Sequence, residues 1–129
     1  MEPTKVLVVE DNLEIADYLR RLLCSCGYTV FVAHTSQEAI SASREHEPDV
    51  VLCDIGLPDS DGYVVGSVLR QASQRQARLI AVTGHTGPQH RLRALAAGFD
   101  QHLEKPVDPK ELLREIQVPN QRSSSYMLG

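Results

Sequence analysis

Five side chains suited to phosphoryl chemistry stand at or just after the ends of short apolar runs. They are two adjacent acids, a third acid, a hydroxyl and a lysine: Glu10, Asp11, Asp54, Thr83 and Lys105. A phosphoryl group in flight spreads negative charge over its oxygens, so its transfer needs positioning and neutralisation by groups such as a hydroxyl and an ammonium. A carboxylate can act as the nucleophile. We therefore expect Asp54 to attack a phosphoryl group and to become an aspartyl phosphate.

The three acids also predict a metal site. Carboxylates packed together repel, and each raises the pKa of its neighbours unless a cation neutralises them. Lys105 supplies a single positive charge. A hard divalent ion would complete the balance, and Mg²⁺ fits because few carboxylates hold it and it keeps several waters. Mg²⁺ is the expected cofactor, and Mn²⁺ is an expected substitute for it.

The apolar runs have the length and composition of strands that are covered on both faces of a parallel sheet. Four are almost wholly apolar and the fifth is weaker: Val6–Val9, Val30–Ala33, Val50–Cys53, Leu79–Val82 and Gln101–Glu104. Helical patterns separate them, which predicts an α/β fold with right-handed crossovers and helices on both faces. Ligands of such folds bind beyond the carboxyl ends of the strands, where the five side chains stand.

Apolar side chains at three- and four-residue spacing mark the helices. Four such sets occur: Ile15, Ala16, Leu19, Leu22 and Leu23; Val64, Val65, Val68 and Leu69; Leu92, Leu95 and Ala96; and Leu112, Leu113 and Ile116. A helix between the first two sets should open at Thr35, in a capping box with Glu38. Gly98 is placed to end the fourth helix, and Asp108 to cap a fifth that is cut short at Val118.

Length and composition indicate one domain, over residues 1–118, with a flexible polar tail over 119–129. The net charge is −4, from 13 basic and 17 acidic residues, and no dense basic stripe predicts direct nucleic-acid binding. Neither a signal peptide nor a run of about 20 apolar residues is present, so we expect a cytoplasmic protein without membrane insertion. Three cysteines suggest neither a disulfide framework nor a metal site.

Four stretches together resemble the response-regulator receiver domain of two-component signalling: the acid pair that closes VLVVED, and VVLCDIGLPDSDG, LIAVTG and LEKPVDPKEL. The resemblance runs from about Lys5 to Ile116, and the spacing between the motifs agrees as well. It implies a flavodoxin-like (βα)5 fold with a parallel sheet of order 2-1-3-4-5. It also implies a phosphorelay in which a histidine kinase or phosphotransfer protein is the donor, and a downstream protein target or fused output domain responds.

The same resemblance assigns roles to individual residues. Asp54 is the phosphoacceptor, Asp11 binds Mg²⁺ directly, and Glu10 acts mainly through water. The backbone carbonyl of Gly56 completes the protein's share of the metal ligands. Thr83 hydrogen-bonds a phosphoryl oxygen, Lys105 pairs with the phosphoryl group, and the peptide bond between Lys105 and Pro106 is cis.

The family's aromatic switch position falls on His102, where Tyr or Phe is usual. We expect Thr83 and His102 to act together as the switch. His102 should be exposed before phosphorylation, should turn inward afterwards, and should then show a lower pKa because burial disfavours the charged ring. The alternative is a plain surface histidine on an edge strand.

Other functions remain open at this stage. Singly, the acids, Thr83 and the turn after Asp54 could be explained by helix capping and by strand or turn preferences. An aspartate-nucleophile phosphatase of the haloacid dehalogenase type would need a second Asp where Gly56 stands, and a cap domain. A receiver that binds partners without being phosphorylated is a further alternative. The chain is not expected to be a separate enzyme, and its parent could be a hybrid histidine kinase.

Overall fold

Strands and helices alternate along the chain in the computed structural model, which describes residues 3–57, 62–72, 77–84 and 88–118. The strands are β1 (Lys5–Val9), β2 (Thr29–Ala33), β3 (Val50–Asp54), β4 (Arg78–Thr83) and β5 (Gln101–Glu104). The helices are α1 (Leu13–Ser25), α2 (Ser36–His46), α3 (Gly62–Ala72), α4 (Pro88–Ala96) and α5 (Pro109–Gln117). The predicted tail, 119–129, lies outside the described residues. Within the described ranges, no helix is long and apolar enough to cross a membrane.

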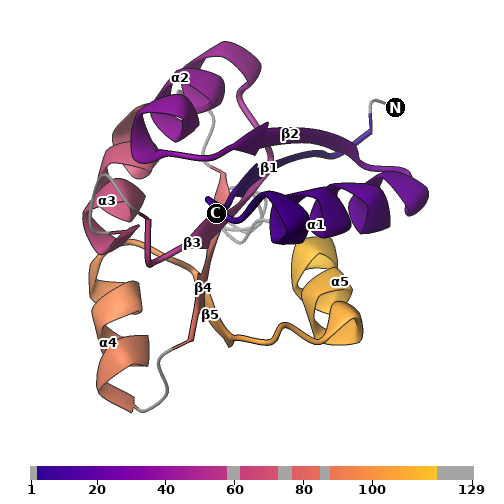
Figure 1. Cartoon of the computed structure of the whole chain (residues 1–129). Coiled ribbons are helices and arrows are strands. Elements are labelled where there is room, and N and C mark those ends of the chain that lie inside the picture. Colours follow the sequence, from indigo (N-terminus) through magenta and orange to yellow (C-terminus); the bar gives the residue numbers. More distant parts are fainter. Residues whose placement is uncertain (1–2, 58–61, 73–76, 85–87, 119–129) are drawn as a thin grey trace, which may run out of the picture.

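The five strands form one parallel sheet in the order β2-β1-β3-β4-β5, which confirms the predicted fold class and strand order. Figure 1 shows the two outer layers: α1 and α5 cover one face of the sheet, and α2, α3 and α4 cover the other. All carboxyl ends of the strands therefore point to the same edge, where each strand gives way to a loop and a helix.

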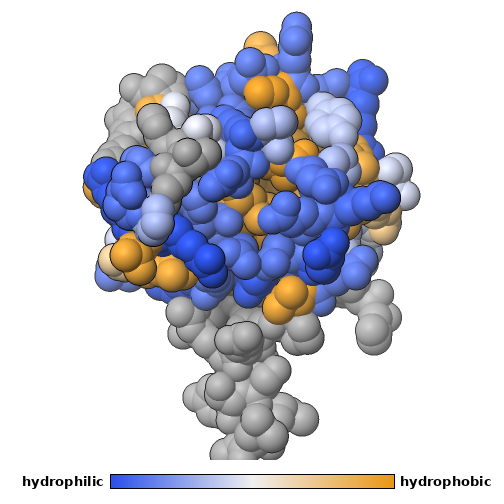
Figure 2. Space-filling view, turned by 90° about the horizontal axis from the view of Figure 1, so that it is seen from below, coloured by the Kyte–Doolittle hydropathy of each residue, from blue (hydrophilic) through white to orange (hydrophobic). Residues whose placement is uncertain are grey.

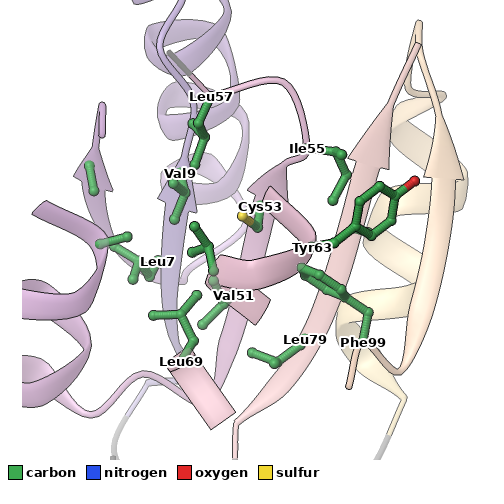
Figure 3. Close-up of a cluster of buried hydrophobic side chains, with 14 of the residues drawn as sticks. Leu7, Val9, Val51, Cys53, Ile55, Leu57, Tyr63, Leu69, Leu79 and Phe99 are labelled. Atoms are coloured by element: carbon green, nitrogen blue, oxygen red, sulfur yellow. The ribbon is translucent and has the colours of Figure 1, made fainter. Parts of the chain in front are cut away.

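Side chains alternate between the two faces of the sheet, as the period of two along a strand requires. Leu7, Val51 and Leu79 pack toward α2, α3 and α4, with Tyr63 and Phe99 from the helical layer and the loop after α4 (Figure 3). Val8, Leu52 and Ile80 pack toward α1 and α5. Burial of each such aliphatic side chain contributes about 1.5–3 kcal/mol, so the central strands form a rigid base for the residues that follow them.

Polar caps fix the starts of three helices next to the carboxyl edge. The Asn12 side chain accepts hydrogen bonds from the N–H groups of Glu14 and Ile15 at the start of α1. The predicted caps are confirmed: Thr35 Oγ1 accepts from Glu38 N–H at 3.1 Å, and Asp108 Oδ1 from Lys110 N–H at 2.9 Å. Because each cap satisfies N–H groups left open by the helix, the loops leaving β1, β2 and β5 have defined ends.

The apolar residues that mark α4 in the sequence do not face the core. Leu92 is 65% exposed and Leu95 45% exposed, whereas Ala94 is fully buried. Successive residues of a helix point about 100° apart, so the small side chain at 94 occupies the inner face and both leucines are turned outward. Figure 2, seen from the lower side of Figure 1 where α4, β5 and α5 lie, shows apolar patches separated by hydrophilic surface.

Gly66 lies where α3 packs against the loop that follows α4, so a substitution there tests this contact. A Cβ added there would lie 2.4 Å from Cε2 of the buried Phe99 ring. Overpacking of this kind costs about 1–3 kcal/mol, against roughly 1 kcal/mol that Ala gains over Gly in a helix, so Gly66→Ala should lower the free energy of unfolding by up to about 2 kcal/mol. Urea unfolding followed by circular dichroism measures this.

Gly84→Ala is the matched control, because an added Cβ at that position meets nothing within 4 Å. The clash explanation also requires the cost of Gly66→Ala to shrink in a Phe99→Leu background. An equal cost in both backgrounds would contradict it.

Candidate functional site

The register of the sheet brings the predicted site residues to one edge. Glu10 and Asp11 directly follow β1, Asp54 ends β3 and Thr83 ends β4, and Lys105 follows β5. Neighbouring strands are paired up to these ends, with Asp54 opposite Val82 and Thr83 opposite Glu104. The loop after β5 is tied back to β4, since Lys105 N–H donates to the Thr83 carbonyl at 2.8 Å.

Three carboxylates and one ammonium meet at the centre of this edge. One carboxylate oxygen from each of Glu10, Asp11 and Asp54 lies within 4.8 Å of those of the other two. Lys105 Nζ lies 3.2 Å from Asp54 Oδ2 and 3.4 Å from Glu10 Oε1, so it bridges the two buried acids. The structure thus brings together the acids and the lysine that sequence analysis predicted for the site.

Asp54 is only 6% exposed, and both oxygens of its carboxylate have partners. Oδ1 accepts a hydrogen bond from Gly56 N–H at 3.0 Å, and Oδ2 faces Lys105. A carboxylate that is held by an N–H group and an ammonium keeps its orientation. Gly56 and Asp11 are exposed, so the side of Asp54 that faces them is reached from solvent.

Glu10 is the most strongly perturbed acid of the site. The pKa of the Glu10 carboxyl is raised from 4.5 to about 7, mainly by burial, with a further raising effect of Asp54 and opposing effects of the Asn12 N–H and Lys105. Burial lowers the pKa of Lys105, but the attraction of Asp54 and Glu10 outweighs that effect and leaves it raised. The lysine stays charged, and one carboxyl readily keeps a proton when no further cation is present.

The donor set fits the expected Mg²⁺. Three carboxylates and one ammonium sum to a charge of −2, which a divalent cation balances. The available ligands are hard oxygens, as Mg²⁺ prefers, and the exposed Asp11 leaves room for the waters that this ion retains. The peptide bond between Lys105 and Pro106 is cis, as the family resemblance implies.

His102 differs from its expected state. It was predicted to be exposed before phosphorylation, but the ring is half-buried and its Nε2 is enclosed, without a hydrogen-bond partner among the described residues. Burial already lowers the pKa of His102, opposed by Glu104 and reinforced by His90 and Arg91. The prediction of an exposed ring is wrong because α4 packs beside β5 and covers part of His102. His102 also lines a groove of about 700 Å³ together with residues of α4 and α5.

Sequence analysis missed two residues at the same edge. Asn12, the residue that caps α1, also donates its backbone N–H to Glu10 Oε2 at 3.1 Å. His34, the first residue after β2, was not considered at all, and its ring Nδ1 lies 3.0 Å from the Glu10 carbonyl oxygen. The available signal was positional: a polar residue directly after a predicted strand stands on the edge where the ligands of a parallel sheet bind.

Comparison with known proteins agrees with this geometry. The family model for the response regulator receiver domain matches residues 6–117, and the chain therefore belongs to this family. The transcriptional regulatory protein KdpE of Mycobacterium tuberculosis is 36% identical over 122 residues, covering 95% of this chain and 53% of KdpE. The chain thus spans about half the length of that relative.

Two solved structures are similar over most of the chain. A CheY-like response regulator receiver domain protein from Methanospirillum hungatei has a TM-score of 0.83 and 29% identity, covering 90% of this chain and 92% of that one. A response regulator protein from Burkholderia pseudomallei, solved with a phosphorylated aspartic acid, a calcium ion and citrate, has a TM-score of 0.82 and 25% identity. It aligns with 96% of this chain and 72% of its own.

The pKa of Glu10 predicts how stability depends on pH without metal. Between about pH 4.5 and 7 the folded protein binds more protons than the unfolded chain, so this stabilising contribution is complete below pH 4.5 and lost by about pH 7. The contribution of Glu10 to the free energy of unfolding should fall by on the order of 3 kcal/mol over that range. Glu10→Gln should flatten the profile, because an amide does not titrate.

Urea unfolding in EDTA at a series of pH values measures both profiles. Added Mg²⁺ should restore stability to the wild type most strongly near and above pH 7, since metal and proton compete for the same carboxylates. Parallel pH profiles for wild type and Glu10→Gln would contradict this account of Glu10.

Proposed function

We propose that this domain accepts a phosphoryl group on Asp54 from a phosphohistidine of a partner kinase or phosphotransfer protein, in a Mg²⁺-dependent reaction in the cytoplasm. The phosphorylated domain then changes its interactions with a downstream protein or a fused output domain. The observation that carries the proposal is the setting of Asp54: it is buried, held by Gly56 N–H and Lys105, and placed beside two further acids.

The transfer would use Asp54, Lys105 and Thr83 together with the bound metal ion. A carboxylate oxygen of Asp54 forms a bond to phosphorus while the bond from phosphorus to the donor's imidazole nitrogen breaks, and the electron pair returns to that nitrogen. Lys105 neutralises charge on the phosphoryl oxygens, and the Thr83 hydroxyl donates a hydrogen bond to one of them. Hydrolysis then resets the site. A water oxygen attacks phosphorus, the bond from phosphorus to the Asp54 oxygen breaks with its electron pair returning to the carboxylate, and inorganic phosphate leaves with the protons of the water.

Metal binding belongs to the same proposal. Asp11, Asp54 and the Gly56 carbonyl would hold Mg²⁺ directly, and Glu10 would act mainly through water. When bound, the ion supplies the positive charge that lets an anionic carboxylate approach an anionic phosphoryl group. Mn²⁺ can take its place, because it prefers the same oxygen ligands.

An exposed apolar surface beside the site suits a phosphohistidine-bearing partner. Leu13, Ile15 and Tyr18 of α1 are 67%, 40% and 52% exposed and lie next to the acids. Ile15 and Tyr18 also line a cavity of about 210 Å³ that reaches Asp54 and Pro106. A donor must contact this rim to bring its phosphorus to Asp54, and apolar side chains there can be buried in the complex.

The conformational change that follows phosphorylation of Asp54 would pass through Thr83 and His102. Movement of the Thr83 hydroxyl toward a phosphoryl oxygen changes the space beside β5, where the His102 ring already lies half-buried. A neutral ring can move further inward, whereas an imidazolium would lose hydration. The half-length match to KdpE supports a parent protein with an output domain as one arrangement, and a stand-alone domain is the other.

Phosphorylation by a small donor tests the acceptor. With Mg²⁺ and acetyl phosphate, the wild type should gain the mass of one phosphoryl group, and EDTA should abolish the gain. Asp54→Asn should not be labelled, because an amide is not a competent nucleophile here. Intact-protein mass spectrometry measures both. Asp17→Asn on the exposed face of α1 is the control and should label normally; equal labelling of Asp54→Asn would exclude Asp54 as the acceptor.

Lys105→Arg should separate phosphorylation of Asp54 from the conformational change that follows it. The guanidinium keeps the positive charge, so labelling by acetyl phosphate should persist. Its planar fork cannot take the place of a compact ammonium between Asp54 and Glu10, so the rearrangement at Thr83 should fail. Phosphorylation-dependent NMR shifts of Thr83 and His102 measure the response. If Lys105→Arg shows the wild-type shifts, the lysine acts as a counter-charge alone.

A further inference from the structure

His34 stands directly beside the acids of the site. β1 and β2 are paired to their ends, with Val9 opposite Ala33, so the next residue of each strand, Glu10 and His34, emerges at the same edge. Glu10 N–H donates to the Ala33 carbonyl at 2.9 Å, and the His34 ring Nδ1 lies 3.0 Å from the Glu10 carbonyl oxygen. Two consecutive residues, Ala33 at the end of β2 and His34 directly after it, thus hold both backbone groups of Glu10.

The chemistry of this contact defines the protonation of the ring. A carbonyl oxygen accepts hydrogen bonds and cannot donate, so the Nδ1 of His34 must carry the proton. Nδ1–H is present both in one neutral tautomer and in the imidazolium. In the neutral ring, Nε2 is then the proton-free nitrogen.

His34 is itself held by the start of α2. The Glu38 carboxylate receives Thr35 Oγ1–H at 3.3 Å and the His34 N–H at 3.5 Å, while Thr35 caps the helix. The capping box of α2 therefore extends one residue toward the site, and it limits the positions that the half-buried His34 ring can take.

The Glu10 carbonyl is the group through which His34 reaches the metal ligands. It belongs to the peptide unit that joins Glu10 to Asp11, and a peptide unit is planar, so fixing the direction of the carbonyl fixes the position of Asp11 N and Cα. Asp11 lies between β1 and the N-cap Asn12, outside any regular element. The orientation of this peptide unit therefore determines where the exposed Asp11 carboxylate lies in the acid cluster.

We propose that His34 is a positioning residue of the metal site: its Nδ1–H holds the Glu10 carbonyl and so prearranges the Asp11 carboxylate for Mg²⁺. This inference rests on the proposed function, because it presumes that the acids bind Mg²⁺. Residues that orient metal ligands in this way typically change metal affinity by 10–100-fold when they are replaced. The His34 contact acts through the backbone, so we expect a loss of about tenfold.

Calorimetric Mg²⁺ titrations of the full chain, without any phosphoryl donor, test the proposal. His34→Ala should weaken Mg²⁺ binding by about tenfold. His34→Asn should restore binding to within about twofold of wild type, because its amide nitrogen is as many bonds from Cα as Nδ1 is and can donate to the same carbonyl. His34→Gln places its amide one bond further out and should behave as His34→Ala.

Controls separate positioning from a general loss of structure. His46, which stacks on Phe31 with ring centroids 3.8 Å apart, is another half-buried histidine beside β2 with no contact to the acids among the described residues. His46→Ala should lower thermal stability while Mg²⁺ affinity stays at the wild-type value. Long-range ¹H–¹⁵N NMR spectra of the wild type should show neutral His34 protonated at Nδ1 and bare at Nε2.

The outcomes are distinguishable. If the wild type binds Mg²⁺ and Asp11→Asn weakens it, but His34→Ala has the wild-type affinity, the role of His34 is overturned and the proposed function stands. A neutral ring protonated at Nε2 overturns it as well. If neither the wild type nor any variant binds Mg²⁺, the metal-dependent function and this inference both fall.

Discussion

The Lys105 ammonium, shared between Asp54 and Glu10, is the contact on which the site depends. Two buried carboxylates side by side are costly unless a cation and hydrogen bonds accompany them. The lysine follows β5 at the edge of the sheet, while the acids belong to β1 and β3, so this bridge also ties the outer strand to the centre. With Asp11 included, one ammonium still faces three carboxylates. In the metal-free protein the pKa of Glu10 is raised mainly by burial, and the neighbouring Asp54 adds to that effect. A divalent cation and a proton can thus each reduce the cost of burying the Glu10 carboxylate beside Asp54.

The sheet holds the three carboxylates close together in spite of their mutual repulsion. The strands beneath the acids are buried on both faces, and their registers leave little freedom in where each strand ends. At the carboxyl edge of the sheet, the polar side chains of Asn12, Thr35 and Asp108 cap the helices that follow β1, β2 and β5. A rigid apolar base and a hydrogen-bonded rim are complementary, because repulsion between the acids cannot be relieved by moving either the strands or the loop ends.

Local signals in the sequence were sufficient for most of the fold and for the chemical groups of the site. Runs such as Val50–Cys53 predict buried parallel strands, and the carboxyl-edge rule then places Asp54 beside Glu10 and Lys105. Features that depend on packing between distant segments were not predictable. The outward direction of Leu92 follows from the close approach that Ala94 allows, and the enclosure of His102 from the distance between α4 and β5. His34 carries no motif, and its contact with Glu10 appears only when β2 is paired with β1.

The alternation of side chains along β3 and β4 separates two surfaces of the molecule. Asp54 continues the row of Val50 and Leu52, which faces α1 and α5, whereas Thr83 continues the row of Leu79 and Ala81, which faces α2, α3 and α4. Under the proposed function, a phosphoryl donor seated on α1 would leave the α4 side of the molecule uncovered (Figure 1). The donor and a downstream protein would then occupy different surfaces, and the downstream protein would be able to bind before the donor dissociates.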